Sequence, residues 1–260
     1  MTEFVLEVPG GRLQVEETGA GEPVLLLHAG VTDSRVWDVT GPLLVSAGYR
    51  VVRYDARGFG RSPASERPFS PVADALAVLD ATGVPAAHFV GLSRGAATAV
   101  DVALAVPHRV RTLTLVAPGL SGYEWPRLPG REQRLAAAEY GDMHGLALEV
   151  AHLWAPMSFQ AGDQPEDFAS RVVREQAEAF MTDELEAEQP PALPRLGGIT
   201  APTLVVLGDR DVEAVERIGR LLSDEIPGAT LVTLTGADHV LPLRVPDRLH
   251  SLLVEHLRRG

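Results

Sequence analysis

The segment from His88 to Asp101 reads HFVGLSRGAATAVD, in which a short apolar run, a G-x-S-x-G turn and a small-residue helix follow one another. The pattern predicts a buried strand that ends at the turn and a helix that covers residues 96–106. Such a turn is tight and strained, so Ser93 stands at its tip. Residues two positions before and after the serine approach each other, and only small residues such as Gly91 and Gly95 fit there.

Short apolar runs alternate with helical patterns along the chain, which predicts an α/β fold with a mostly parallel sheet and helices on both faces. Alternating residues on either side of Pro9-Gly10-Gly11 predict an opening hairpin. Ser70-Pro71 is a good helix start, and Pro246-Asp247 starts the last helix. We expect about eight strands, at Phe4–Val8, Arg12–Glu17, Val24–Leu27, Arg50–Tyr54, Phe89–Val90, Leu113–Val116, Leu204–Leu207 and Leu231–Leu234.

Residues 119–198 break this alternation because they contain helical patterns and no good strand. The helices are expected at Arg131–Tyr140, Gly145–Leu153 and Asp167–Met181. We therefore expect a core made of residues 1–118 and 199–260, with residues 119–198 inserted as a helical cap.

The cap segment is rich in aromatic residues and methionines. These side chains can form an apolar, adaptable roof over a pocket, or they can fill a small helical core of the cap itself. The candidate substrate-binding residues are Trp125, Trp154, Phe159 and Met143 of the cap, together with Val31 of the core.

Composition excludes several classes of site and partner. The chain of 260 residues has no cysteine, which excludes disulfides, thiol catalysis and cysteine-ligated zinc. Its net charge of −12 opposes nonspecific binding to nucleic acid or anionic membranes. The opening MTEFVLEVPGG lacks the pattern of a signal peptide, and the longest apolar run is too short to span a bilayer. We expect a cytoplasmic protein with a small-molecule partner. The sequence does not indicate its oligomeric state.

Four further segments lie in the order typical of one superfamily: His28-Ala29-Gly30, Asp55 to Ser62, Gly208-Asp209-Arg210-Asp211 and Gly236-Ala237-Asp238-His239. With the Ser93 turn, they make nearly the whole chain resemble the α/β-hydrolase superfamily. The branch it looks most like is the 3-oxoadipate enol-lactonase group of small-molecule esterases and lactonases. The resemblance implies a catalytic triad in the order serine, acid, histidine, which here gives Ser93, Asp211 and His239.

His239 is the best candidate for the base among eight histidines, because it follows the last strand, at the edge where loops converge on an active site. The resemblance gives His28 a loop-shaping role. His88 precedes its strand at the opposite edge of the sheet. His144 and His152 lie in the cap, with a surface role or a substrate contact. His108, His250 and His256 are expected to be solvated surface residues.

The acid is expected on the loop after the strand at residues 204–207, where Asp209, Asp211 and Glu213 all lie. The family pattern G-x-x-D selects Asp211. Asp209 can instead turn toward the helix start or pair with Arg210. No carboxylate follows the strand at residues 113–116, where some relatives carry their acid, and this strengthens the choice of Asp211.

An oxyanion hole needs two backbone N–H groups. One belongs to Arg94, and the resemblance assigns the other to Gly30, with Val31 as the alternative because Ala29 replaces the usual glycine. The Arg94 side chain either contacts an anionic substrate or forms an internal salt bridge. The loop from Asp55 to Ser62 is either a pocket wall or a turn locked by its own charged residues.

The sequence as a whole predicts a cofactor-independent serine hydrolase that acts on a small carboxylic ester or lactone with an apolar portion. It has no G-x-G-x-x-G, P-loop or H-E-x-x-H motif, so no nucleotide cofactor and no zinc are indicated. The same triad also fits carbon–carbon bond hydrolysis or a lactonising, cyclising step in a biosynthetic pathway. A ligand receptor with little turnover is the alternative from another class, although such a receptor need not keep a complete triad.

Overall fold

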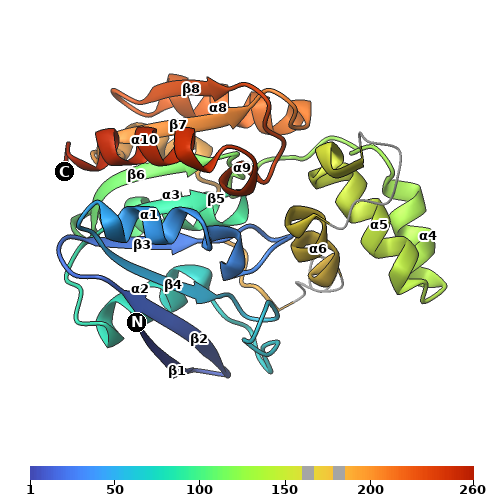
Figure 1. Cartoon of the computed structure of the whole chain (residues 1–260), viewed down its shortest axis with the longest axis horizontal. Coiled ribbons are helices and arrows are strands. Elements are labelled where there is room, and N and C mark those ends of the chain that lie inside the picture. Colours follow the sequence, from blue (N-terminus) through green and yellow to red (C-terminus); the bar gives the residue numbers. More distant parts are fainter. Residues whose placement is uncertain (160–166, 178–184) are drawn as a thin grey trace.

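The fold is built on one twisted sheet, seen in a computed structural model that describes residues 1–159, 167–177 and 185–260 (Figure 1). Its strand order is β1-β2-β4-β3-β5-β6-β7-β8. The first hairpin pairs antiparallel to itself and to β4, and every later pairing is parallel, as the sequence predicts. The strands are β1 (Thr2–Val8), β2 (Gly11–Thr18), β3 (Pro23–Leu27), β4 (Arg50–Asp55), β5 (Ala87–Leu92), β6 (Val110–Val116), β7 (Thr203–Gly208) and β8 (Thr230–Leu234).

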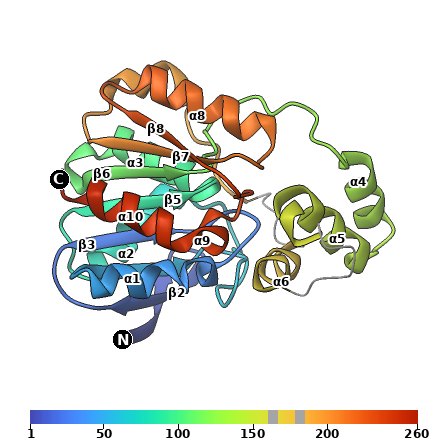
Figure 2. The ribbon, with the colours of Figure 1, turned by 45° about the horizontal axis from the view of Figure 1, so that its top comes forward.

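Helices cover both faces of the sheet, and the alternation of side chains along a strand explains why. In β3, Val24 and Leu26 join one buried cluster, whereas Leu25 and Leu27 join the other. Helices α1 (Thr40–Ser46), α9 (Leu241–Arg244) and α10 (Pro246–Leu257) lie on the first face, in front of the sheet in Figure 2. Helices α2 (Pro71–Ala81), α3 (Arg94–Ala105) and α8 (Glu213–Glu225) cover the other face.

The start of α2 shows how local sequence sets an element's limits. Ser70 caps the helix by accepting a hydrogen bond from the Ala73 N–H, and Pro71 occupies the first helical position. The helix stops at Ala81, just before Gly83, whose φ of +66° suits a residue without a side chain. The start of α2 is the one that the sequence predicts.

In the described ranges, three further α-helices lie between β6 and β7 in the chain and beyond the carboxyl edge of the sheet in space (Figures 1 and 2). They are α4 (Arg131–Glu139), α5 (Met143–Trp154) and α6 (Phe168–Glu175). Asp167 caps α6, which ends at Glu175 and so does not continue as predicted; residues 178–181 of the predicted helix lie outside the described residues. The described part of segment 119–198 contains no strand, only a single bridge between Phe69 and Glu186.

None of the helices in the described ranges is both long and apolar enough to cross a membrane.

The position of His256 differs from the prediction, because this histidine lies inside the protein and not on its surface. Only 3 % of it is exposed, and Nε2 donates to the carbonyl oxygens of Leu113 and Pro202 at 3.0 and 3.2 Å. The polar residues around it suggest an exposed helix end, but α10 lays this face on the sheet, where two carbonyl groups need a donor. Burial lowers the pKa of His256 from its ordinary value.

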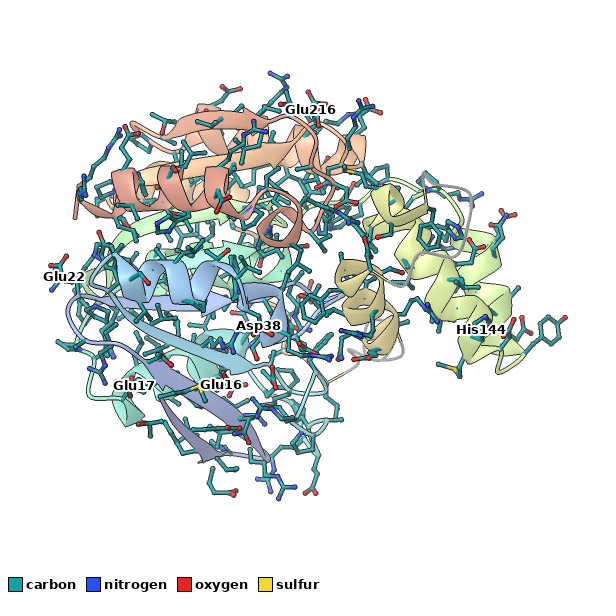
Figure 3. The ribbon with its side chains drawn as sticks, viewed as in Figure 1. Glu16, Glu17, Glu22, Asp38, His144 and Glu216 are labelled. Carbon is teal, nitrogen blue, oxygen red and sulfur yellow. The ribbon has the colours of Figure 1, made fainter. Side chains whose placement is uncertain are left out.

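His88 is also placed differently in detail, because it lies within β5 and does not precede it. Its ring is fully buried, and Nδ1 makes a 2.9 Å hydrogen bond with the Thr112 hydroxyl. Glu22 approaches its other side, at the edge of the sheet opposite the three inserted helices (Figure 3). The predicted position at the amino edge is therefore confirmed.

Candidate active site

Ser93 occupies the turn between β5 and α3 with a backbone φ of +54° and ψ of −113°. A side chain on Gly91 would place its Cβ 2.3 Å from the carbonyl oxygen of Gly95. On Gly95, a Cβ would lie 2.4 Å from the carbonyl oxygen of Leu27. The two glycines thus allow the close approach that forces a serine into a backbone region it rarely adopts. Such strain costs on the order of 1–3 kcal/mol, which the surrounding structure must offset.

His239 and Asp211 form a buried pair at the carboxyl ends of the neighbouring strands β7 and β8. Nδ1 of His239 lies 2.8 Å from Oδ2 of Asp211, and their side chains are 1 % and 3 % exposed. The carboxylate can only accept, so Nδ1 carries the proton and Nε2 carries a lone pair. Among the described residues, Nε2 has no hydrogen-bond partner. The arrangement therefore leaves a basic nitrogen without a partner on a residue that lines the same pocket as Ser93.

Asp209 has a different environment from Asp211, although only two residues separate them. Its Oδ1 accepts hydrogen bonds from the N–H groups of Gly236 and Ala237 at 2.7 and 3.3 Å. The Nε of Arg210 lies 3.8 Å from the same oxygen. Asp209 thus holds the turn that leads to His239 and does not face the imidazole.

The loop after β3 is shaped by His28, whose two ring nitrogens are both occupied. Nε2 accepts from the Ala56 N–H at 2.8 Å, so the proton resides on Nδ1, which donates to the Ala29 carbonyl oxygen at 2.7 Å. Burial lowers the pKa of His28, which favours this neutral form. Nothing is left on this imidazole to act as a base.

Two amides of the same loop remain available for an oxyanion. The Ala29 N–H donates to the Thr32 hydroxyl. The amides of Gly30 and Val31 have no hydrogen-bond partner within the described part of the chain, and both residues line the pocket of Ser93. Gly30 and Val31 therefore both stay candidates for the second donor.

The Arg94 side chain forms an ion pair with Glu186, so the internal salt bridge foreseen as one alternative is present. Its guanidinium also lies over the Phe59 ring, 5.2 Å from the centroid. The partner carboxylate lies 92 positions further along the chain, at the end of the inserted segment. Arg94 also lines the pocket, so part of its side chain faces the space next to Ser93.

The loop from Asp55 to Ser62 is a locked turn. Asp55 accepts hydrogen bonds from the N–H groups of Ser34 and Arg61 at 2.9 and 3.0 Å. Arg57 forms a buried, two-pronged ion pair with Asp74 of α2, at 2.7 and 2.8 Å. The turn is thus fixed by partners on its own strand end, on the β3 loop and on α2.

The pocket that contains Ser93 and His239 has a volume of about 360 Å³ and is walled mainly by apolar groups. Trp154 of α5 lies against the imidazole, with ring centroids 4.3 Å apart. Trp125 meets Trp154 edge to face at 6.4 Å. These two tryptophans and Val31 are the predicted substrate residues that reach the pocket.

Phe159 and Met143 do not line this pocket, which corrects the expectation for these two residues. Phe159 stacks on His152, with ring centroids 3.9 Å apart. Met143 is 42 % exposed at the start of α5, near the tip of the inserted helices where Figure 3 labels the exposed His144. Composition alone cannot tell which face of an inserted helix points inward, and that explains the error.

Ser121 and Leu128 also line the pocket, although the sequence did not identify them as site residues. Ser121 donates to Oδ2 of the buried Asp101, so its hydroxyl is held in place. It lies shortly after the carboxyl end of β6, and that position was the available signal. Nothing in the sequence around Leu128 marks it. The described residues contain no group of three or more histidine, aspartate or glutamate side chains placed to hold a metal ion.

Comparisons with known proteins identify the family and the fold. A family model described as alpha/beta hydrolase fold matches residues 22–244. Rhodomycin D methylesterase DnrP of Streptomyces peucetius is 30 % identical to the chain, with 92 % of each protein covered. The 2-hydroxy-6-oxo-6-phenylhexa-2,4-dienoate hydrolase of Burkholderia cepacia is 28 % identical over 96 % of this chain and 92 % of its own length. The solved enol-lactonase of Burkholderia xenovorans LB400 superposes with a TM-score of 0.81 at 25 % identity, covering 98 % of this chain and 99 % of that one.

Proposed function

Because the chain belongs to the α/β-hydrolase family, we propose that it is a cofactor-independent serine hydrolase that cleaves a small carboxylic ester or lactone. One observation carries the proposal. His239 forms a buried hydrogen bond with Asp211, its Nε2 has no hydrogen-bond partner among the described residues, and the residue lines the same pocket as Ser93. A serine hydroxyl is a poor nucleophile near neutral pH, and it needs a base that a third group orients.

In the proposed reaction, Nε2 of His239 takes the proton of Ser93 as Oγ attacks the carbonyl carbon of the substrate. Asp211 keeps the imidazole in the Nδ1–H form and stabilises the imidazolium that results. The imidazolium then gives its proton to the leaving alcohol, and an ester on Ser93 remains. Water then attacks this acyl-enzyme as His239 takes its proton, and the imidazolium returns that proton to Oγ of Ser93 as the bond to the acyl group breaks and the acid leaves.

The negative charge that develops on the carbonyl oxygen needs donors that are already in place. In this proposal they are the backbone N–H of Arg94 and that of Gly30, with Val31 as the alternative to Gly30. The first belongs to the residue that follows the nucleophile, at the start of α3, where the helix dipole also favours negative charge.

The pocket supports a substrate with an apolar portion. It is small, at about 360 Å³, and Trp125, Trp154 and Leu128 supply much of its wall. One relative is named a methylesterase and one solved structure is named an enol-lactonase, which supports an ester or a lactone as the substrate class. We take residues 119–198 to be the cap that bounds the substrate, because both tryptophans come from this segment.

A second candidate is the hydrolysis of a carbon–carbon bond, which a relative at 28 % identity favours through its name as a dienoate hydrolase. The same serine, histidine and aspartate serve both reactions. Turnover of esters and lactones compared with that of a vinylogous diketone distinguishes them, and the proposal expects the former to be faster.

Mass spectrometry of the trapped acyl group tests the proposal. The protein is mixed with a panel of esters and lactones and quenched within one turnover. We expect the peptide that contains Ser93 to gain the mass of the acyl group, and the Ser93→Ala variant to gain none. A burst of product equal to the enzyme concentration distinguishes an enzyme from a receptor. Absence of both adduct and turnover across the panel would contradict the proposal.

A further inference from the structure

Helix α6 contacts the two loops that flank Ser93, one loop at each of its ends. In Figures 1 and 2 it lies nearer the edge of the sheet than α4 does. None of its residues lines the pocket around Ser93. Its contacts with the loops therefore call for an explanation other than substrate binding.

The first end of α6 is joined to the loop that carries His239. Asp167 caps the helix by accepting from the Ser170 N–H at 2.8 Å, and it also accepts from Arg244 at 2.7 Å. The same guanidinium donates to the carboxylate of Asp238, at 3.0 Å from both Nε and NH2. Asp238 is fully buried and directly precedes His239. One arginine thus links the start of α6 to the residue next to the proposed base.

The residues just before α6 strengthen this link. The Met157 N–H donates to Oδ2 of Asp238 at 3.1 Å, and the Ser158 hydroxyl donates to Asp167 at 2.9 Å. Burial alone would raise the pKa of Asp167, but hydrogen bonds from the Ser170 N–H, Arg244 and Ser158 lower it below its ordinary value. The ionised carboxylate is therefore the form that the contact stabilises.

The second end of α6 is joined to the loop that carries Gly30 and Val31. Gln176 is the C-cap of the helix, and its Nε2 donates to Oδ2 of Asp33 at 2.9 Å. Its Oε1 accepts from the Gly60 N–H at 3.0 Å. Asp33 is 1 % exposed, and Gln176 is 7 % exposed. This contact is therefore largely shielded from water.

An arginine bridges this end as well. Arg35 places NH2 2.6 Å from the carboxylate of Asp33 and 2.6 Å from that of Glu175, the last residue of α6. Asp33 in turn caps the short helix that follows the β3 loop. The position of the loop amides and the position of the helix end are therefore fixed together.

We propose that α6 is a strut that sets the distance between the His239 loop and the loop of the oxyanion amides. Asp167 and Gln176 are its positioning residues. About nine helical steps separate them, or roughly 13 Å along the axis, so direct interaction between the two side chains is negligible. The inference rests on the proposed function, because it assigns α6 a part in aligning the base and the oxyanion donors.

The strut makes a prediction that two independent anchors do not make. If α6 transmits position, breaking either end releases the alignment, and breaking the second end adds little. If each end merely holds its own loop, the two losses multiply. Since the helix does not line the pocket, the loss is expected in kcat and not in KM.

A double-mutant cycle tests this prediction. Asp167→Asn keeps a good helix cap but removes the charge that faces Arg244. Gln176→Met keeps the length of the side chain but removes both hydrogen bonds at the other end. Each variant, and the double variant, is assayed with a small activated acetate ester, and rates are given per Ser93 titrated with an organophosphate. Tm is measured for each protein, so that loss of folded protein is seen separately.

We expect each single variant to lower kcat about tenfold or more, since a displacement of about 1 Å at reacting groups costs that much and more. The kcat of the double variant should lie within about twofold of the kcat of the less active single variant. Fold-changes that multiply, or singles with unchanged kcat, would overturn the strut.

Arg109→Met is the matched control. The Arg109 side chain is about as shielded from water as that of Arg244 and forms an ion pair with Asp80 at 2.7 Å, away from α6. It should leave kcat unchanged. Loss of kcat in the control variant would attribute the effect to lost stability. A wild-type protein that turns over no ester and takes no organophosphate on Ser93 would instead contradict the proposed function, which separates the two failures.

Discussion

The two edges of the sheet each contain a buried histidine, and the comparison shows what separates a base from a structural residue. At the carboxyl edge, Nδ1 of His239 meets the carboxylate of Asp211, and the residue lines a pocket. At the amino edge, Nε2 of His256 donates to two carbonyl oxygens in the packed interior. Each imidazole keeps one buried nitrogen without a hydrogen-bond partner among the described residues. Burial is therefore common to both, whereas the carboxylate and the cavity are not.

The backbone differs between the two edges in the same sense. Within the described residues, Ser93 and Ala117 are the two non-glycine residues with positive φ, and both follow strands at the carboxyl edge. At the amino edge, the turns that lead into β4, β5 and β8 use Gly48, Gly83 and Gly228 for positive φ. Strain is concentrated where the reaction is proposed, and the opposite edge is built without it.

Removing the proposed nucleophile gives the largest expected effect. Ser93→Ala should lower kcat for an activated ester by roughly a thousandfold or more, because the variant lacks the hydroxyl that forms the acyl-enzyme in the proposed reaction. Tm should stay close to that of the wild type, since the side chain at the tip of the turn is small and open to the pocket. Near-normal turnover by a properly folded variant would break the functional half of the comparison.

Two aspartates two positions apart provide the next effect. Asp211→Asn should lower kcat roughly a thousandfold, because an amide at this position favours the wrong tautomer of His239. Asp209→Asn should cost less than about tenfold, because its Oδ1 only accepts from the turn amides of Gly236 and Ala237 and the amide oxygen can do the same. Steady-state kinetics with one ester suffices, and the opposite ranking would reassign the acid.

A smaller effect is expected in the inserted helices. Trp125→Ala should change the preference among esters of different acyl size about tenfold, since one apolar contact is worth roughly 1–3 kcal/mol. Phe159→Ala should instead leave the preference unchanged and lower Tm, because this ring stacks on His152 outside the pocket. Rates over a series of acyl lengths test both. If Phe159→Ala changed the preference among esters and Trp125→Ala did not, Phe159 and not Trp125 would be the residue that contacts the substrate.

The smallest effect concerns stability at the amino edge. Burial lowers the pKa of His88 and of His256 below their ordinary value of 6.5. Below that pH the unfolded chain binds protons that the folded protein does not, so stability is kept above about pH 6.5 and lost as the pH falls. The urea midpoint should therefore be lower at pH 5.5 than at pH 7.5.

His256→Gln provides the control for that dependence, because its amide N–H can still donate toward the carbonyl oxygen of Leu113 but does not titrate. The fall in the urea midpoint between the two pH values should be smaller in this variant, with kcat at pH 7.5 unchanged. An equal fall in both proteins would mean that His256 does not contribute to the dependence.

Much of the core could be predicted because its signals are local. The strands follow from short apolar runs, and the turn at Ser93 follows from the spacing of Gly91 and Gly95. The proximity of Asp211 to His239 follows from topology, since each ends a neighbouring parallel strand. In such a sheet, distant parts of the chain meet at one edge by construction.

The remaining features depend on pairs that leave no local trace. The Arg244–Asp167 pair spans 77 positions, and the Gln176–Asp33 hydrogen bond spans 143. The burial of His256 depends on which face of α10 meets the sheet, and the orientation of Phe159 depends on how the inserted helices pack. Composition and periodicity specify that such residues exist, but not the partner each one finds.

The contacts at both ends of α6 have a consequence for recombining this protein with its relatives. A helical insertion that supplies no reacting group looks exchangeable, and a chimera could receive one from another enzyme without a change to the serine, the histidine or the acid. The host would still present Arg244 and Asp33, however, and each would lose its contact with α6 unless the donor segment supplies a matching side chain. A successful transplant therefore has to bring an acidic side chain and an amide at the two matching helix ends, or replace both host residues at the same time.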